Sequence, residues 1–219
     1  MPAAAGRPDR LRAAHHRRRG GELTVLPGNP STATLHQQVV DALVRDMVNI
    51  VESPVGLIVG PWPLAADEEG IGDAIHRALL ADDWAESGMR DKHLQRLIDV
   101  QLVARNRQYG ADHAGGADLG ITLHGEVVGR LLLDLDDAAP GVEFEGAAVT
   151  LVDISVHPQW QRQGIGGEVL RVLLTAAADA NRPVRLSAVF GTVALNWFLA
   201  VGFRESGGDV LYHQLEWRP

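Results

Sequence analysis

Two glycines stand one residue apart in the segment Gln161-Arg162-Gln163-Gly164-Ile165-Gly166-Gly167, between an expected strand and an expected helix. Glycines at this spacing let the backbone turn sharply with its N–H groups pointing inward. The helix that begins there adds unpaired N–H groups and the positive end of its dipole, and Arg162 adds a fixed charge. This combination favours an anion cradle suited to a pyrophosphate.

Two common phosphate-binding motifs do not fit this segment. A P-loop ends in Gly-Lys-Ser/Thr, and Lys92 is the only lysine of the chain. A dinucleotide fingerprint needs a third glycine three residues after the second, and that position is Val169. The form that does fit, Gln-x-x-Gly-x-Gly, is the coenzyme A signature of the GNAT acyltransferase superfamily, which this sequence resembles.

The resemblance extends along most of the chain. Residues 152–158 (Val-Asp-Ile-Ser-Val-His-Pro) look like the fourth strand of that superfamily and its exit turn, and residues 124–130 look like the preceding hairpin. Ala194, Phe198 and Gly202-Phe203 match the spacing of its second conserved helix, and residues 90–109 resemble a helix of one bacterial branch. Over residues 56–217 the resemblance implies an α/β fold. Its mixed, largely antiparallel sheet would be flanked by helices, and a splayed parallel strand pair would hold acyl-CoA.

The resemblance also implies where the cofactor, acetyl-CoA, lies. The strands ending near Val156 and Val189 would splay apart around it, and a substrate amine would attack the thioester directly, without a covalent enzyme intermediate. The implied cofactor-binding residues are Ile154, Ser155 and Val156 for the pantetheine, Gln161, Arg162, Gln163, Gly164, Ile165, Gly166 and Gly167 for the pyrophosphate, and Asn196 on the following helix.

Two residues are candidates for the base, and two others are candidates for the proton donor. Asp153 is the first candidate for the base, since it is a carboxylate on the cofactor strand, although an ion pair would be a structural role for it. Glu145 is the second candidate. The superfamily often places a proton-donating Tyr where this chain has Phe198, so Tyr212, Ser155 or solvent would have to protonate the thiolate, or catalysis would be reduced or absent.

Hydrophobic periodicity divides the chain into three parts. Residues 1–30 lack periodicity and carry an arginine triplet, which indicates a disordered basic tail. Residues 31–55 predict an amphipathic helix, and residues 56–219 predict the acyltransferase-like domain. Inside that domain we expect a strand at 56–59, helices at 67–81, 89–108, 166–180 and 192–200, strands at 119–123, 127–135, 147–156 and 184–189, and one or two strands within 210–217.

The amino-acid composition indicates which classes of ligand and partner the protein can bind. The net charge is −8, and beyond residue 22 the chain holds 14 basic and 26 acidic residues, so the body should repel nucleic acid and favour cationic ligands. No apolar run is long enough for a membrane span and no signal peptide is evident, which favours a cytoplasmic protein with no membrane partner. The richness in Ala, Gly and Arg is typical of GC-rich bacterial genomes.

The sequence therefore predicts an N-acetyltransferase that moves an acetyl group from acetyl-CoA to a primary amine of a small molecule or peptide. A homodimer is compatible with this fold. The nine histidines are scattered and cysteine is absent, so no metal is expected. A non-catalytic acyl-CoA-binding sensor or interaction module is the alternative, because Phe198 replaces the usual tyrosine.

Overall fold

A computed structural model describes residues 41–42, 57–61, 70–85, 87–135 and 147–219 of the chain. The chain divides into two compact units, Met1–Pro30 and Ser31–Pro219, and every described residue belongs to the second. The predicted tail at 1–30 lies outside the described residues. So does the predicted helix at 31–55, apart from Asp41 and Ala42, which are helical.

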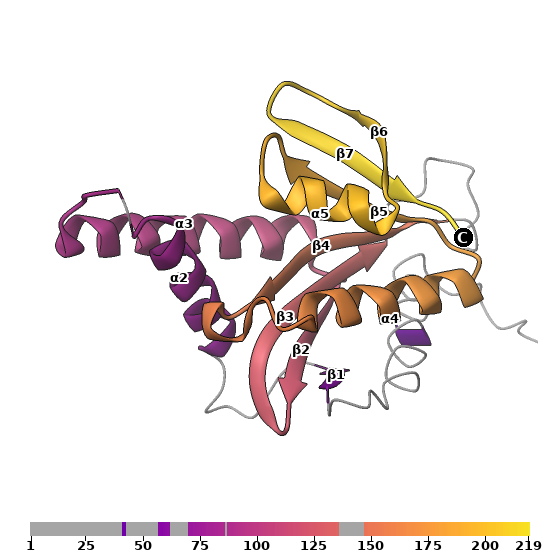
Figure 1. Ribbon diagram of the computed structural model, residues 1–219, viewed down its shortest axis with the longest axis horizontal. Coiled ribbons are helices and arrows are strands. Elements are labelled where there is room, and N and C mark those ends of the chain that lie inside the picture. The colour runs from indigo at the N-terminus through magenta and orange to yellow at the C-terminus, as the bar shows by residue number, and fades with distance from the viewer. Residues whose placement is uncertain (1–40, 43–56, 62–69, 86, 136–146) are drawn as a thin grey trace, which may run out of the picture. The chain divides into compact units, whose positions relative to one another are not determined.

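A seven-stranded sheet in the order β1-β2-β3-β4-β5-β7-β6 forms the centre of the second unit (Figure 1). Neighbouring strands are antiparallel except β4 and β5, which are parallel. This arrangement confirms the predicted mixed, largely antiparallel sheet. The strands are β1 (Leu57–Pro61), β2 (Ala117–Leu123), β3 (Glu126–Leu135), β4 (Val149–Val156), β5 (Val184–Val189), β6 (Arg204–Gly208) and β7 (Tyr212–Trp217).

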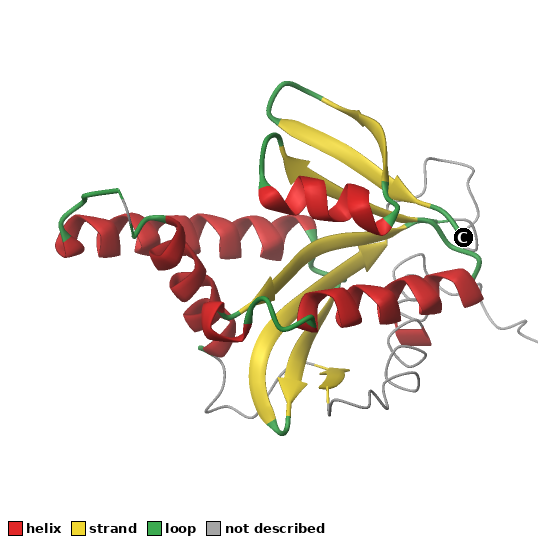
Figure 2. Ribbon diagram, viewed as in Figure 1, coloured by secondary structure: helices red, strands yellow, loops and turns green. Residues whose placement is uncertain are grey.

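Helices cover both faces of the sheet (Figure 2). They are α2 (Ile71–Asp83), α3 (Asp91–Asp112), α4 (Ile165–Asp179) and α5 (Val193–Val201), with a short 3-10 turn, η3, at Pro158–Trp160. The α4 helix buries an apolar face that includes Val169, Leu170 and Leu173 in the main core. Strand β5 alternates strictly, with Val184, Leu186 and Ala188 buried and the residues between them exposed, which is typical of a strand with one face on the core.

Helix α3 and strand β6 depart from the sequence-based expectation. Helix α3 runs to Asp112, four residues past the predicted end, and carries Gly110 in its last turn. A helix tolerates one glycine when its neighbours pack well, and Tyr109 packs here beside two arginine side chains. Strand β6 was not predicted, because its glycine-rich sequence Arg-Glu-Ser-Gly-Gly has little strand propensity and only its pairing with β7 extends it.

A β-bulge in β4 reverses which residues face each side of the sheet. Leu151 lies opposite Leu133 and Asp153 lies opposite Leu132, so Val152 is an extra residue without a partner on β3. Before the bulge, Val149 and Leu151 join the core beneath α4. After it, Ile154 packs against that core, and Asp153 shares a face with Leu132. If β4 alternated regularly through Val152, with no bulge, Asp153 would share the face of Val149 and Leu151 and point into the apolar core.

Candidate functional site

Strands β4 and β5 separate almost as soon as they meet. They pair at Val149 with Val184 and at Thr150 with Arg185, and β5 then continues alongside β7 as far as Val189. Figure 1 shows the two strands together near the C-terminus and diverging away from it. The second half of β4 therefore lacks a strand neighbour on its β5 side, and its backbone groups there are free to bind an extended ligand.

The glycine-rich turn adopts left-handed backbone conformations at two positions. Gly164 has φ +84° and precedes the first residue of α4, and Arg162 has φ +60°. Such a φ is routine for glycine but strained for arginine. The side chain of Gln161 donates to the carbonyl of Val156 at 3.0 Å, and that of Gln163 donates to the carbonyl of Gln159 at 3.2 Å. The first bond fastens the turn to the end of β4, and the second fastens it to η3.

A cavity of about 460 Å³ lies between this turn, the end of β4 and α5. Eight of the predicted cofactor-binding residues line it: Ile154, Val156, Gln161, Arg162, Gly164, Ile165, Gly166 and Gly167. Sequence reasoning missed four further lining residues, which are Trp160, Val193, Ala194 and Trp197. The cavity thus meets the N-terminal turns of both α4 and α5, and the two helix dipoles favour an anion there.

Three predicted cofactor-binding residues do not line this cavity. Ser155 is buried and lies opposite Arg130 in the register, so it belongs to the other face of β4. Gln163 and Asn196 are exposed. Thr192, rather than Asn196, caps α5, since its hydroxyl accepts a hydrogen bond from the Leu195 amide at 3.2 Å.

Asp153 lies on the face of the sheet that α2 and α3 cover. Its side chain is 15 % exposed, and its Oδ2 atom lies 3.9 Å from Nη1 of Arg105 on α3. Within the described part of the chain, neither atom has a hydrogen-bond partner, and both are shielded from solvent. Burial raises the pKa of Asp153, and the guanidinium groups of Arg105 and Arg130 oppose that rise.

Charged and aromatic side chains surround Asp153 on this face. Arg105 donates from Nη2 to Asp73 at 3.3 Å, and Arg130 donates to both carboxylate oxygens of Asp118 at 2.7 Å. The guanidinium carbons of Arg105 and Arg130 lie 5.4 Å and 5.8 Å from the centre of the Tyr109 ring. Burial, together with the charge of Asp153, raises the pKa of Tyr109 to about 12. The phenol is therefore neutral at physiological pH.

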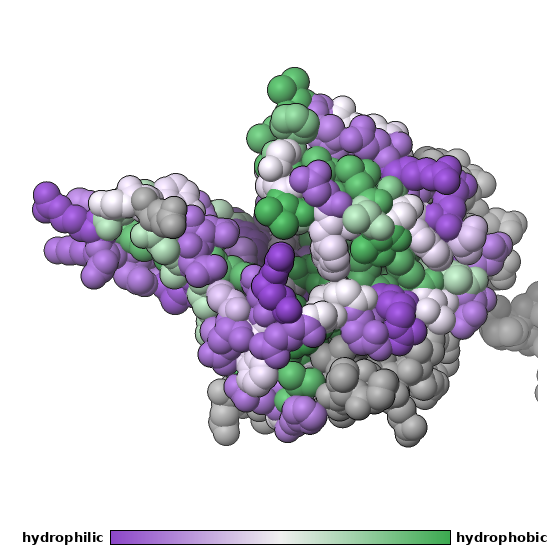
Figure 3. Space-filling model, viewed as in Figure 1, coloured by the Kyte–Doolittle hydropathy of each residue, from purple (hydrophilic) through white to green (hydrophobic). Residues whose placement is uncertain are grey.

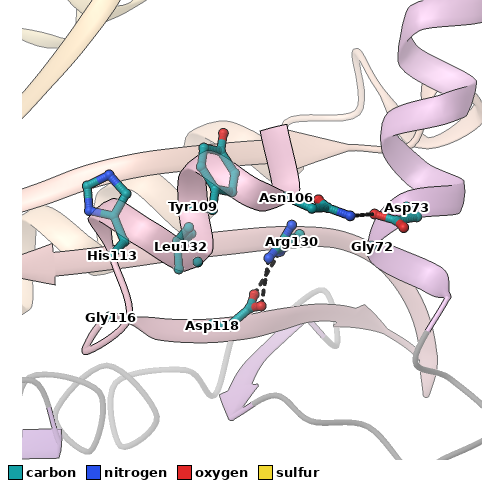
Figure 4. Close-up of a pocket in the computed structure, with 10 residues that line it drawn as sticks. Gly72, Asp73, Asn106, Tyr109, His113, Gly116, Asp118, Arg130 and Leu132 are labelled. Atoms are coloured by element: carbon teal, nitrogen blue, oxygen red, sulfur yellow. Dashed lines mark hydrogen bonds and ion pairs between the residues drawn. The ribbon is translucent and has the colours of Figure 1, made fainter. Parts of the chain in front are cut away.

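A second cavity, of about 350 Å³, opens beside this cluster between α2, α3 and strands β2 and β3. Figure 4 shows Asp73 reaching it from α2, Tyr109 and His113 from the end of α3, and the Arg130–Asp118 pair from the sheet. The Tyr109 hydroxyl points away from that pair. Strand β4 thus has the glycine-turn cavity on one face and lies beside this polar cavity on the other.

Comparison with known proteins identifies the family. A model of the acetyltransferase (GNAT) family matches residues 75–203, more than half of the chain. The chain belongs to this family. No curated protein sequence matches it.

Solved GNAT structures share the fold of the chain at low sequence identity. PaiA N-acetyltransferase from Thermoplasma acidophilum, solved in complex with coenzyme A, is 12 % identical with a TM-score of 0.52, over 74 % of this chain and 99 % of that one. An acetyltransferase from Thermus thermophilus is 21 % identical with a TM-score of 0.51, over 74 % of this chain and 97 % of that one. The strand order and the parallel β4–β5 pair are thus those of a GNAT acetyltransferase.

The remaining predicted site residues lie in different parts of the fold. Phe198, which the sequence resemblance aligns with the tyrosine of the superfamily, is buried, and its ring centroid lies 4.8 Å from that of Trp197 and 5.6 Å from that of Phe203. Tyr212 begins β7, pairs with Val189 and is 45 % exposed. It does not line the glycine-turn cavity. Glu145 lies outside the described residues.

The polar face of α3 was the main feature that sequence reasoning missed in this GNAT domain. Ile98 and Leu102 are buried, and the same face continues through Arg105 and Tyr109 to His113 at the end of the helix. This spacing of three and four residues is visible in the sequence. The change from apolar to polar residues along this one face of the helix was the signal for a site that the sequence offered.

In the described ranges, no group of three or more His, Asp or Glu side chains is arranged to hold a metal ion. None of the described helices is both long and apolar enough to cross a membrane.

Proposed function

We propose that this GNAT protein transfers the acetyl group of acetyl-CoA directly to a primary amine. The observation that carries the proposal is the separation of β4 from β5 after two residue pairs, with the 460 Å³ cavity and the glycine-rich turn beside the gap. The structural similarity to an N-acetyltransferase solved with coenzyme A supports it. The proposed acyltransferase domain spans residues 56–219.

The cofactor-binding groups are mostly backbone atoms in this proposal. The amides of residues 162–167 and the N-terminal turns of α4 and α5 bind the pyrophosphate, and Arg162 adds a positive charge. The backbone of Ile154, Ser155 and Val156 hydrogen-bonds the pantetheine amides along the open side of β4. Ser155 therefore contributes through its main chain, because its side-chain face is turned away from the cavity.

The acceptor approaches from the α2 and α3 side in this proposal. Its amine nitrogen attacks the thioester carbonyl carbon, the C–S bond breaks, and the products are an amide and free coenzyme A. Asp153 takes the proton that the amine loses, because it is the carboxylate of β4 that faces this side. Tyr212 is the proposed proton donor for the leaving thiolate, and solvent is the alternative. Glu145 stays the second candidate for the base.

Calorimetry of acetyl-CoA binding tests the cofactor site. A substitution at Gly164 would strain the backbone at φ +84°, whereas Gly167 has an ordinary φ and open space around its missing Cβ. We therefore expect Gly167→Glu to abolish binding, because it places a negative side chain beside the pyrophosphate, and Gly167→Ala to weaken binding far less. Equal binding by all three proteins would contradict the cofactor site.

Turnover of acetyl-CoA with an amine tests the proposed acetyl transfer. The release of free thiol from acetyl-CoA, measured with lysine amide, 1,4-diaminobutane and a peptide with a free N-terminus, should reveal an acceptor. Asp153→Asn should then lower kcat by about 100-fold or more while leaving acetyl-CoA affinity unchanged. Acetyl-CoA binding without turnover of any amine would instead favour the non-catalytic acyl-CoA-binding module, to which the buried Phe198 already points.

A further inference from the structure

The ion pair between Arg105 and Asp153 has an unusual geometry. The side chain of Arg105 is only 9 % exposed, and a guanidinium so shielded beside a carboxylate normally closes to hydrogen-bond distance. Here the nearest atoms, Nη1 and Oδ2, are 3.9 Å apart. Neither makes a hydrogen bond to the described residues, and neither is exposed to solvent. Such an unpaired buried group is costly and calls for an explanation.

Other contacts of Arg105 explain why the pair stays open. Its Nη2 atom donates to Asp73 of α2 at 3.3 Å, and Nε and Nη2 approach Oδ1 of Asn106 at 3.3 and 3.2 Å. Asn106 itself donates to the same Asp73 oxygen at 2.9 Å. The guanidinium also lies over the Tyr109 ring. These contacts hold the guanidinium near Asp153 but short of a hydrogen bond with it.

The open geometry of the Arg105–Asp153 pair suits a carboxylate that acts as a catalytic base. A carboxylate that accepts a proton must be charged before the reaction, and it must have a lone pair that no donor occupies. A nearby positive charge stabilises the charged form, and a closed salt bridge would in addition occupy an oxygen and lower the proton affinity of the carboxylate further. At 3.9 Å the charge of Arg105 still acts on the carboxylate, but no donor occupies the oxygen that must accept the proton.

We propose that Arg105 is a positioning residue that holds the Asp153 carboxylate charged yet free of a hydrogen bond. This inference rests on the proposed function, in which Asp153 is the base. It makes α2 part of the catalytic machinery, because Asp73 on α2 fixes the guanidinium of Arg105.

The charged and titratable groups around the Arg105–Asp153 pair come from four elements. Arg105 and Arg130 stabilise its charged form, and burial and Asp118 destabilise it. Tyr109 is neutral, with a pKa near 12. Burial lowers the pKa of His76, which interacts with both arginines and with Asp73, to about 4, so it too is neutral at physiological pH. The charged and titratable groups are Asp73 and His76 on α2, Arg105 and Tyr109 on α3, Asp118 on β2 and Arg130 on β3.

The test is a direct titration of Asp153 by NMR in protein with ¹³C-labelled aspartate carboxyl groups, with Asp153→Asn identifying its signal. Arg105→Gln removes the positive charge, so the Asp153 midpoint should rise by about one pH unit or more. Asp73→Asn frees the guanidinium to close on the carboxylate, so the midpoint should fall. Arg77→Gln is the matched control, because Arg77 pairs with Asp99 between the same two helices at the surface, and it should leave the midpoint unchanged.

Two outcomes would overturn the proposal. If Arg105 is purely structural, Arg105→Gln will lower the melting temperature and leave the Asp153 titration unmoved. If Arg105→Gln does not fold, Asp73→Asn tests the proposal alone, because the fall expected for its Asp153 midpoint does not depend on losing the charge of Arg105. Full transfer by Asp153→Asn would refute the base itself and therefore the positioning role. An inactive Asp153→Asn combined with an unmoved titration would refute the positioning role alone and leave the proposed function standing.

Discussion

At the scale of single residues, Arg162 is held in a conformation that an arginine rarely adopts. Its φ of +60° lies in the left-handed region, and its neighbours in the turn line the glycine-turn cavity. Arg162→Gly should relieve this strain and raise the free energy of unfolding by up to about 1 kcal/mol, an effect that the greater freedom of glycine in the unfolded chain partly offsets. The same change should weaken acetyl-CoA binding, because the positive charge is lost.

The variant Arg162→Ala distinguishes the effect of backbone strain on stability from the effect of the lost charge on acetyl-CoA binding. Alanine removes the same charge but keeps a Cβ at a positive φ, so this variant should bind acetyl-CoA as weakly as Arg162→Gly without gaining stability. Urea unfolding and calorimetry of both variants measure the two effects. If the alanine variant is as stable as the glycine variant, the turn stores no strain at residue 162.

At the scale of elements, Gly129 on β3 determines how closely β3 can approach β4. A Cβ at Gly129 would lie 2.5 Å from the carbonyl oxygen of Ser155 and 2.9 Å from Cδ1 of Ile121. Because the first of these atoms belongs to the backbone of β4, rotation of a side chain cannot relieve the clash. Gly129→Ala should therefore lower the free energy of unfolding by about 1–3 kcal/mol and also weaken acetyl-CoA binding.

Gly110→Ala is the matched control for this substitution. Gly110 lies within α3, and a Cβ there would meet no atom within 4 Å. Alanine should stabilise the helix by about 0.5–1 kcal/mol, since glycine costs conformational entropy in a helix. Chemical unfolding of the two variants checks the opposite signs, and a loss of stability in both would contradict the steric argument.

Local sequence patterns were sufficient to predict most helices and strands, but they did not predict the orientation or the partner of Asp153. The apolar face of α4 and the alternation of β5 specify those elements directly, and the glycine spacing predicts the turn between β4 and α4. The orientation of Asp153 depends on the bulge at Val152, and a bulge leaves no mark in a pattern of alternating residues. The partnership of Asp153 with Arg105 joins residues 48 positions apart, which no local periodicity reports.

At the scale of the whole molecule, the two faces of the sheet differ in chemistry. Figure 3 shows polar residues over α2 and α3 and apolar residues over α5 and the turn between β6 and β7. The exposed apolar residues there are Val189, Phe190, Val193, Val210, Leu211 and Tyr212. Val193 also lines the glycine-turn cavity, so the apolar surface continues into the proposed cofactor site, whereas the charged cluster lies on the proposed acceptor side.

This division predicts where acetyl-CoA will slow backbone hydrogen exchange when no acceptor is present. The open side of β4, the glycine-rich turn and the first turn of α5 should become protected, because they supply the backbone groups that bind the cofactor. Peptides that cover residues 151–167 and 192–197 should therefore exchange more slowly by mass spectrometry, and those from residues 91–112 should not change. Protection confined to α3 and β2–β3 would instead place acetyl-CoA in the polar cavity, and the assignment of the two cavities would have to be exchanged.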